Sequence, residues 1–547
     1  MTQTAGEHAR ETRPPNPPGF WRQGEPLVWF SGAALTITLM AVASLIAVVM
    51  VKGLGFFWPA QVAQVELADG ETVIGEERRE EVSTQTGDDR IQFKIGNRDL
   101  YGLDFRWIDA NEIVETGFPD EIVVVERREN GNFYGRIGAV SSEGLTGATP
   151  DTWDQLQAAR AALEPQVERR EQLVDELSAL SDQMESNRLD LQKLQYRGAG
   201  PDDPRVVELT QRQAELQGRF EEIDKQSAEQ MTQLRRHSLT MVDAKGTSKE
   251  IPLIDVYRVY RPNQMSLISK AGFYGAKVVE LLSDKPREAN TEGGLAPAIF
   301  GTVLMVLLMS LFCIPMGVIA AIYLREYARE GLLVRLVRIA VGNLAGVPSI
   351  VYGVFGLGFF IYGLGASIDR MFFPERLPTP TFGTGGLLWA SLTLSLLTVP
   401  VVIVATEEAL AAVPRGIREG SLALGATKFQ TLVRILMPMA SPGIMTGLIL
   451  AMARAAGEVA PLMLVGVVKL APAMPLDSSP PFLHFDRKFM HLGFHIYDVG
   501  FQSPNVEAAK PMVYVTTLLL VGIVILMSAS AIHLRNKMRK RFTTGVF

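Results

Sequence analysis

The chain has 547 residues, of which 47% are apolar and 20% charged, and its formal net charge is −6. The length excludes a small single domain, and the net negative charge excludes a basic protein, so no nucleic-acid partner is expected. The single cysteine, Cys313, excludes an intramolecular disulfide. The six histidines form no metal-ligand cluster, since His491 and His495 stand four residues apart without nearby cysteines, so neither a metal nor a cofactor is expected.

Six apolar stretches are long enough to cross a bilayer, which takes about 20 apolar residues each. Five of them contain no Asp, Glu, Lys or Arg. A soluble protein can bury one such helix but not six in series, so the sequence predicts an all-α polytopic membrane protein with six transmembrane helices. The expected spans are Leu27–Val51, Pro297–Leu324, Ile339–Ser367, Phe382–Thr406, Met439–Val468 and Pro511–His533.

The first span follows a polar leader, residues 1–26, and is expected to stay as an anchor over 27–51. It is too long for a cleaved signal peptide and lacks a small-residue cleavage site. With the N-terminus inside, the inner segments hold 16 Lys and Arg, whereas the two short outer loops hold 6. The tail, 536–547, adds a strong basic marker. The positive-inside rule therefore predicts that both termini are cytoplasmic.

Residues 52–290 are expected to form a large insert outside the membrane. Through residue 295 this outer part carries 30 basic and 44 acidic residues, against 23 and 15 in the rest of the chain. Alternating apolar runs within 61–145 predict strands, and Asp69-Gly70 and Asn130-Gly131 predict hairpin turns. Further strands are expected near 238–244 and 255–260, which makes the insert α+β.

Within the insert, residues 152–236 have helical periodicity and predict an antiparallel helical hairpin. The polar run 197–204 must break the helix, and a seven-residue pattern resumes at Val206. Its arms would reach roughly 45–65 Å from the strands at 1.5 Å per residue. The hairpin is either a rigid spacer or self-association element, or a docking arm for a solute-binding protein or companion subunit. One repeat position holds Leu173, Leu180 and Leu194, the other Leu177, Met184 and Leu191, and Asn187 interrupts the first.

The polar, basic segment 411–438 lies between two apolar spans, and its second part reads REGSLALGATKFQTLVRILMP from Arg418 to Pro438. A short helix, a glycine turn and a second short helix on a membrane face suit a docking surface. Glu419 is the expected polar contact, and Gly425 supplies backbone freedom for the turn. Pro438 is expected to set the start of the fifth membrane helix. The candidate docking residues are Glu419, Gly420, Ser421, Gly425, Ile435 and Pro438.

Only the fifth expected span carries charges, Arg454 and Glu458. An Arg at the bilayer centre costs at least about 2.5–3.5 kcal/mol, so a lipid-facing position is not expected. Four residues apart on a helix, the two share one face and can pair. Either they are a buried ion pair that fixes helix packing, or they form an anion site or gate, because a guanidinium can donate two hydrogen bonds to a tetrahedral oxyanion. Gly457 and Pro461 bracket Glu458 and loosen the helix there.

The docking segment resembles the EAA loop of ABC-importer permeases, with Gly420 and Ser421 in place of the usual alanines and Met437 in place of leucine. Further motifs, ARAAGEVAPL (453–462), IAAIYLREYA (319–328), LAGVPSIVYGVFGLG (344–358) and GGLAPAIFGT (293–302), resemble phosphate-import permease subunits of the PstA type. Val459 departs from the threonine common in that family. The resemblance covers 27–60 and about 290–540, so the chain looks like a long variant with an unmatched insert.

This resemblance implies a six-helix permease of the type I ABC-importer class in the bacterial inner membrane, with a five-helix core over 291–535. It implies half of a pore for inorganic phosphate, completed by a PstC-type permease, a cytoplasmic ATPase dimer and a periplasmic phosphate-binding protein. The chain has no G-x-x-x-x-G-K-[ST] phosphate loop, so ATP hydrolysis is expected on the partner ATPase and this chain is not expected to be an enzyme. A permease for sulfate or molybdate, or a non-transporting membrane scaffold, remains the alternative.

Overall fold

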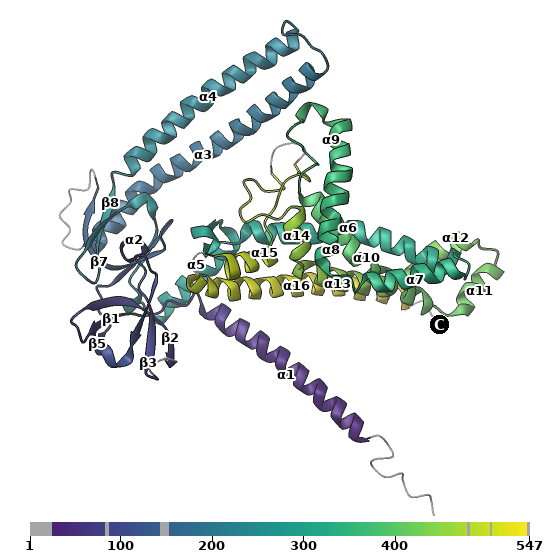
Figure 1. The fold of residues 1–547 in the computed structure, drawn as a ribbon, viewed down its shortest axis with the longest axis horizontal. Coiled ribbons are helices and arrows are strands. Elements are labelled where there is room, and N and C mark those ends of the chain that lie inside the picture. Colours follow the sequence, from purple (N-terminus) through teal and green to yellow (C-terminus); the bar gives the residue numbers. More distant parts are fainter. Residues whose placement is uncertain (1–24, 83–86, 143–151, 478–481, 504–505, 544–547) are drawn as a thin grey trace, which may run out of the picture.

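The computed structural model describes residues 25–82, 87–142, 152–477, 482–503 and 506–543 (Figure 1). Most of the expected leader, 1–26, and the last four residues of the expected tail lie outside the described residues. The molecule consists of a bundle of long apolar helices, a β-rich domain at one end of the bundle, and a long helical hairpin that leaves the β-rich domain (Figure 1).

Six helices among the described residues are long and apolar enough to cross a membrane, which confirms the six expected spans. Each contains an 18-residue window of high hydropathy with few charges, as a bilayer requires. They are Pro26–Gly55, Ala296–Tyr327, Ser349–Phe372, Leu387–Ala411, Lys428–Gly457 and Val506–Lys540.

The third span begins ten residues later than expected. The apolar residues from Ile339 onward belong instead to a separate amphipathic helix, α7 (Leu332–Leu344), because the chain breaks before Pro348. The span itself runs as α8 (Ser349–Phe355), a π-helical stretch η6 (Gly356–Gly365) and α9 (Ala366–Phe372).

The boundaries of the fourth and last spans also differ from the expectation. The fourth span, α10 (Leu387–Ala411), starts after Gly386 because the preceding glycine-rich residues form a loop, and it takes in Glu407 and Glu408 at its other end. The last helix, α16 (Val506–Thr543), continues far beyond His533, so most of the expected basic tail is helical. Charge near a span's end is compatible with a membrane helix, because long side chains there reach the polar interface.

The β-rich part of the insert is built from two five-stranded antiparallel sheets rather than a single layer. The expected turns are confirmed: Gly70 joins β1 to β2 and Asn130-Gly131 joins β6 to β7, all three with positive φ. The first sheet has the order β4 (Phe105–Asp109), β3 (Asp89–Lys94), β2 (Thr72–Val82), β1 (Val62–Leu67) and β5 (Ile113–Gly117). The second has the order β10 (Val256–Tyr260), β6 (Val123–Arg127), β7 (Asn132–Ser141), β8 (Ser238–Val242) and β9 (Ser248–Pro252).

The two ends of the insert are fastened to each other by one side chain, Asn263. Its Nδ2 donates to the carbonyl oxygens of Val62 (2.9 Å) and Pro119 (2.8 Å), and its Oδ1 accepts from the Val62 N–H (2.9 Å). The chain therefore enters and leaves the β-rich domain at the same place. Helix α5 (Leu267–Ser283) then leads to α6 (Ala296–Ile322), the second span.

The helical hairpin is confirmed as α3 (Thr152–Tyr196) and α4 (Pro204–Leu234), with the break where it was expected. Leu173 and Leu180 are buried between the arms with Leu216 and Ile223. The interrupting Asn187 is also buried, and its Nδ2 donates to the Leu209 carbonyl and to Gln213 Oε1, both at 2.8 Å. A buried asparagine with fixed partners pins the register of the two arms.

The hairpin does not stand free of the membrane core. Residues of α3 contact the short helix η7 (Pro374–Arg376), which follows the third span, and Figure 1 shows the far end of the hairpin above α9. That loop is held in place by Asp369, whose buried carboxylate accepts from the N–H groups of Phe382 and Gly383. The insert thus touches the core at the end of α1, at the start of α6 and again at this loop.

Two buried histidines before the last span give folding stability a pH dependence. Burial lowers the pKa of His491 to about 3 and that of His495 to about 4. Because each unfolded histidine has a pKa near 6.5, the unfolded state binds more protons between pH 6.5 and about 3. Stability is therefore complete above about pH 6.5 and falls as the pH is lowered, by up to about 1.4 kcal/mol per pH unit for each histidine.

We predict that His491→Asn flattens this dependence by about half between pH 7 and pH 5. Asparagine keeps an acceptor for the Gly493 N–H, which His491 Nδ1 now accepts at the start of α15 (Leu492–Tyr497). The measurement is the thermal unfolding midpoint of the purified protein in detergent at pH 7, 6 and 5. An unchanged loss of midpoint on acidification would contradict the assignment to His491.

Candidate functional site

Arg454 lies in the last turn of α13, level with the middle of the fourth span. Helix α13 (Met437–Gly457) packs antiparallel against α10, with Gly443 against Ala409 and Gly447 against Ala405. Glycines at these positions let the two backbones approach closely. Continuing the same register puts Arg454 level with Thr398, near the centre of α10.

The fifth span is broken at the level of this charge. Helix α13 ends at Gly457, Glu458 is extended (φ −78°, ψ 133°), and a short helix, α14 (Ala460–Val465), continues the crossing. The carbonyl oxygen of Val465 accepts from the N–H of Gly386 at 2.9 Å, so α14 ends level with the start of α10. Broken backbone at membrane depth is tolerated only where protein or a water-filled cavity surrounds it.

The expectation that Arg454 and Glu458 share one helical face is wrong, because Glu458 lies just beyond the end of α13. The two nevertheless pair, with Arg454 Nε 3.5 Å from Glu458 Oε1. The extended backbone at Glu458 turns its carboxylate back toward the last helical turn. Their side chains are 37% and 19% exposed, so the pair is not sealed inside this chain.

The face of α13 that carries Arg454 is open. Leu450, Ala453 and Gly457 lie on the same side and are exposed, and a Cβ at Gly457 would meet nothing within 4 Å. An arginine halfway across a bilayer cannot face acyl chains without a cost of several kcal/mol. This face therefore suits a wall of an aqueous path, with another protein surface opposite it.

Val459 points away from this open face. One of its methyl groups lies 2.9 Å from where a Cβ at Gly493 would stand, so its side chain packs toward the segment before α15. The hydroxyl that the valine lacks relative to threonine would therefore not lie beside Arg454.

The segment between the fourth and fifth spans has the expected helix–turn–helix form. Helix α11 (Arg415–Ala423) is followed by Gly425, whose φ of 87° lies in the left-handed region, and then by α12 (Lys428–Thr431). Thr427 and Gln430 form a capping box at the start of α12. Pro438 lies in the first turn of α13, but helical backbone already runs from Lys428 through a π turn, η8 (Leu432–Leu436), so the fifth span starts before Pro438.

One side-chain contact joins the two helices of this segment, and another holds the segment on the core. Ser421 Oγ lies 2.9 Å from Thr431 Oγ1 and joins α11 to α12. Arg418 forms an ion pair with Glu326 (3.0 Å), at the end of the second span. Of the other expected docking residues, Glu419, Gly420 and Gly425 are exposed, whereas Ile435 and Pro438 are half-buried in the continuing helix.

Sequence reasoning missed two exposed apolar residues on this segment, Leu424 and Phe429. Leu424 is 91% exposed and precedes the Gly425 turn, and Phe429 is exposed on α12. No local pattern in the sequence distinguishes these two exposed residues from apolar residues that pack inward. Exposed apolar anchors rimmed by polar residues are typical of protein docking sites.

One known family resembles part of the membrane core. Residues 313–540 match the family described as binding-protein-dependent transport system inner membrane component. The matched residues include the broken fifth span and the α11–α12 segment.

Individual proteins similar to this chain include several phosphate transport system permease proteins. The chain is 36% identical over 206 residues to the phosphate transport system permease protein PstA of Mycobacterium leprae, a match that covers 37% of this chain and 62% of that protein. It is 39% identical over 175 residues to PstA 1 of Mycobacterium tuberculosis H37Rv, covering 32% of this chain and 51% of the relative. With PstA of Yersinia pestis it shares 35% identity over 192 residues, 35% of this chain and 59% of the relative.

These matches span less than two thirds of each relative's length. A solved structure of the MetNI methionine ABC transporter, in inward-facing conformations, overlaps 45% of this chain and 95% of its own with 20% identity and a TM-score of 0.33.

We predict that Gly353→Ala destabilises the core, because α8 crosses the broken span at Gly353. A Cβ there would lie 2.7 Å from Pro461 Cα, so α14 must move, at about 1–3 kcal/mol. Gly358→Ala is the matched control, since a Cβ at Gly358 meets nothing within 4 Å. The measurement is the thermal midpoint in detergent; equal midpoints for the two variants would show that this crossing is not tight.

Proposed function

We propose that this chain is the transmembrane permease subunit of an ATP-driven importer of inorganic phosphate. The observation that carries the proposal is the Arg454–Glu458 pair at a helix break halfway across the membrane, on a face that this chain leaves open. The similarity of the core to PstA permeases supports phosphate as the substrate. The chain would supply half of the translocation pore, as an element of the bacterial inner membrane with both termini in the cytoplasm.

Arg454 has the chemistry that phosphate requires. Its planar guanidinium can donate two parallel hydrogen bonds to two phosphate oxygens. Glu458 can accept a hydrogen bond from the hydroxyl group of hydrogen phosphate, and it neutralises Arg454 when no substrate is present. Fully deprotonated sulfate offers no such proton and would be repelled by the carboxylate.

The pair can also act as the gate itself. At 3.5 Å and partly exposed, Arg454 and Glu458 are close enough to attract each other but are not locked by a short hydrogen bond. Separating the two when the helices move would free the guanidinium for the anion. Gly457 next to the break allows that rearrangement with little steric resistance, because the space beside it is open.

Energy would come from another polypeptide, because the chain has no phosphate loop for ATP. The α11–α12 segment would seat in a cytoplasmic ATPase dimer, with Leu424 and Phe429 as apolar anchors and Glu419 as a polar contact. The Arg418–Glu326 ion pair would pass its movement to the second span. A PstC-type permease would complete the pore, and an external phosphate-binding protein would deliver the substrate.

Uptake of labelled phosphate at low external concentration tests the proposal. With membrane levels and complex assembly matched, we expect Arg454→Ala to reduce uptake at least tenfold, since it removes the anion ligand and leaves Glu458 unpaired. Arg370→Ala, an exposed arginine at the end of the third span, is the control and should retain uptake.

The same assay separates the alternatives. Uptake that unlabelled phosphate suppresses but sulfate and molybdate do not supports phosphate. Suppression by sulfate or molybdate instead would identify another oxyanion permease. Absence of any oxyanion uptake by the intact complex would leave the membrane scaffold, and equal uptake by Arg454→Ala would reduce the pair to packing.

A second prediction concerns coupling at the Gly425 turn. Gly425→Val forces a β-branched residue to a φ of 87°, which strains the turn that aims α12 and Leu424. We expect phosphate uptake to fall at least fivefold while the partner ATPase still hydrolyses ATP in the assembled complex. Gly416→Val, on the same segment without a positive φ and with open space, is the control. Unchanged uptake by Gly425→Val would remove Gly425 from the coupling turn.

A further inference from the structure

Helix α5 connects the β-rich domain to the second span, and its charged groups point inward. Lys277 Nζ lies 2.7 Å from Glu126 Oε2 on strand β6 and 3.3 Å from Glu280 Oε2. Burial favours the neutral form of Glu280, but Lys277, Arg287 and Arg258 hold the pKa of this carboxyl below its ordinary value. The helix is therefore fastened to the β-rich domain by a charged network.

The opposite face of α5 is exposed and carries no charge. Ile268 is 87% exposed and Val279 63% exposed, eleven residues apart on the same side of the helix. The exposed positions between them hold only serine, alanine and glycine. The face is about 26 Å long at 1.5 Å per residue. Its exposed residues are Leu267, Ile268, Ser269, Ala271, Gly272, Gly275, Ala276, Val279, Leu282 and Ser283.

The position of α5 is fixed at the ends of the membrane spans. Its Leu281 is buried in one cluster with Ala298 of α6 and Met512 of α16, both near the first residues of their spans. Phe57, just after the first span, packs against the same cluster. Three of the six spans therefore converge on this helix, and Figure 1 shows α5 beside the ends of α1 and α16.

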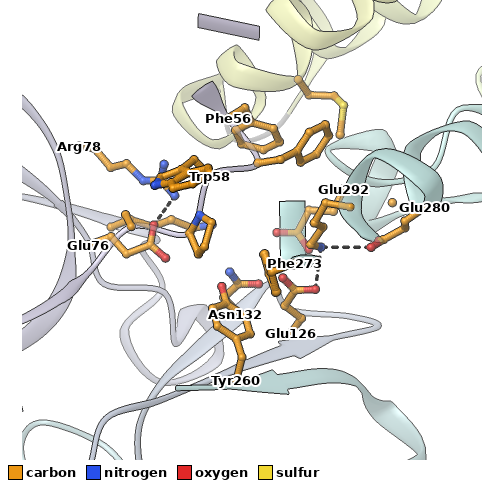
Figure 2. Close-up of a pocket in the computed structure, with 17 residues that line it drawn as sticks. Phe56, Trp58, Glu76, Arg78, Glu126, Asn132, Tyr260, Phe273, Glu280 and Glu292 are labelled. Atoms are coloured by element: carbon orange, nitrogen blue, oxygen red, sulfur yellow. Dashed lines mark hydrogen bonds and ion pairs between the residues drawn. The ribbon is translucent and has the colours of Figure 1, made fainter. Parts of the chain in front are cut away.

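Aromatic side chains join the exposed surface of α5 to that of α1. Tyr274 of α5 has its ring 6.4 Å from Phe57 and 6.3 Å from Trp58, the residues that follow α1. Figure 2 shows Phe56 and Trp58 on one side of a small cavity at this junction, with Glu126, Phe273 and Glu280 across from them. Tyr and Trp side chains gather where membrane spans meet water, because their rings are apolar and their tips polar.

The groups around this apolar face of α5 indicate what covers it. The apolar part of helix α1 is not buried by the rest of the chain, as is expected of a span in contact with lipid. The rings of Phe57, Trp58 and Tyr274 connect this apolar surface to that of α5. A charge-free face of this length in water would be an unusually large apolar patch. An amphipathic helix at the bilayer surface buries such a face about 5–10 Å into the headgroup and acyl boundary.

We propose that α5 lies in the outer interface of the membrane, with the face from Leu267 to Leu282 in contact with lipid. The charged side, with Lys277 and Glu280, holds the β-rich domain, so α5 seats that domain directly on the bilayer. The inference requires only that the six spans cross a membrane, and it does not depend on phosphate or on the Arg454–Glu458 pair.

Nitroxide accessibility in proteoliposomes tests the proposal on the full chain. The lone cysteine is replaced by Cys313→Ser, and single cysteines are introduced at Ile268 and at Val279 for labelling. Leu39→Cys in the middle of α1 reports lipid, and Val114→Cys on strand β5 reports water, since both positions are exposed. Collision rates are measured with oxygen, which concentrates in lipid, and with a water-soluble nickel chelate, in vesicles of phosphatidylethanolamine and phosphatidylglycerol.

The expected oxygen-to-nickel collision ratio at Ile268 and Val279 is at least threefold higher than at Val114 and approaches that at Leu39. A ratio like that of Val114 would place the face in water and overturn the proposal. Low collision rates with both reagents would also overturn it, since they would mean that another protein surface covers the face. Each introduced cysteine replaces an exposed residue, and thermal midpoints equal to that of the Cys313→Ser parent confirm that the fold is kept.

Discussion

A membrane interior leaves no water to compensate a charge or a broken backbone, and the core of this molecule is organised around that constraint. The fifth span brings both into one place, where α13 stops at Gly457 and Arg454 meets Glu458. Each alone is costly in hydrocarbon, and together they are stable only on a surface shielded from lipid. The constraint thus fixes which side of α13 is turned away from the bilayer.

The packing around the break follows from the same requirement. Small residues let α10 and α8 approach α13 and α14 from the other sides, with Gly443 and Gly447 against α10 and Gly353 against Pro461. Close backbone contact without a hydrophobic driving force depends on such residues in a membrane. Helices α10 and α8 of this chain therefore cover two sides of the broken span, and the side that carries Arg454 stays open.

The sequence predicted the parts that depend on local pattern. Length and hydropathy were sufficient for the six spans, the seven-residue repeat for the helical hairpin, and Gly425 for the turn between α11 and α12, because each signal lies within a few neighbouring residues. The start of the third span was misplaced because the apolar residues after Ile339 serve an amphipathic helix, α7, which hydropathy does not distinguish from a crossing.

The geometry of the candidate site depended on contacts that no local pattern contains. The spacing of Arg454 and Glu458 suggested a shared helical face, whereas tertiary packing ends the helix between them. Likewise, nothing in the sequence shows that Arg418 pairs with Glu326, ninety residues earlier, or that Val459 points away from the arginine. Such pairings are set by how spans distant in the chain pack together.

Asn263 has a consequence for how such a molecule can vary. Because this side chain ties the exit of the β-rich domain to its entry at Val62, the two ends of the excursion coincide in space. The polypeptide thus enters and leaves the β-rich domain at one place, and the hairpin makes a separate, non-covalent contact with η7. A related chain could have a shorter, longer or different insert at this position and still keep the same connection between its first two spans. The sequence of the β-rich domain and that of the membrane core are therefore free to change at different rates.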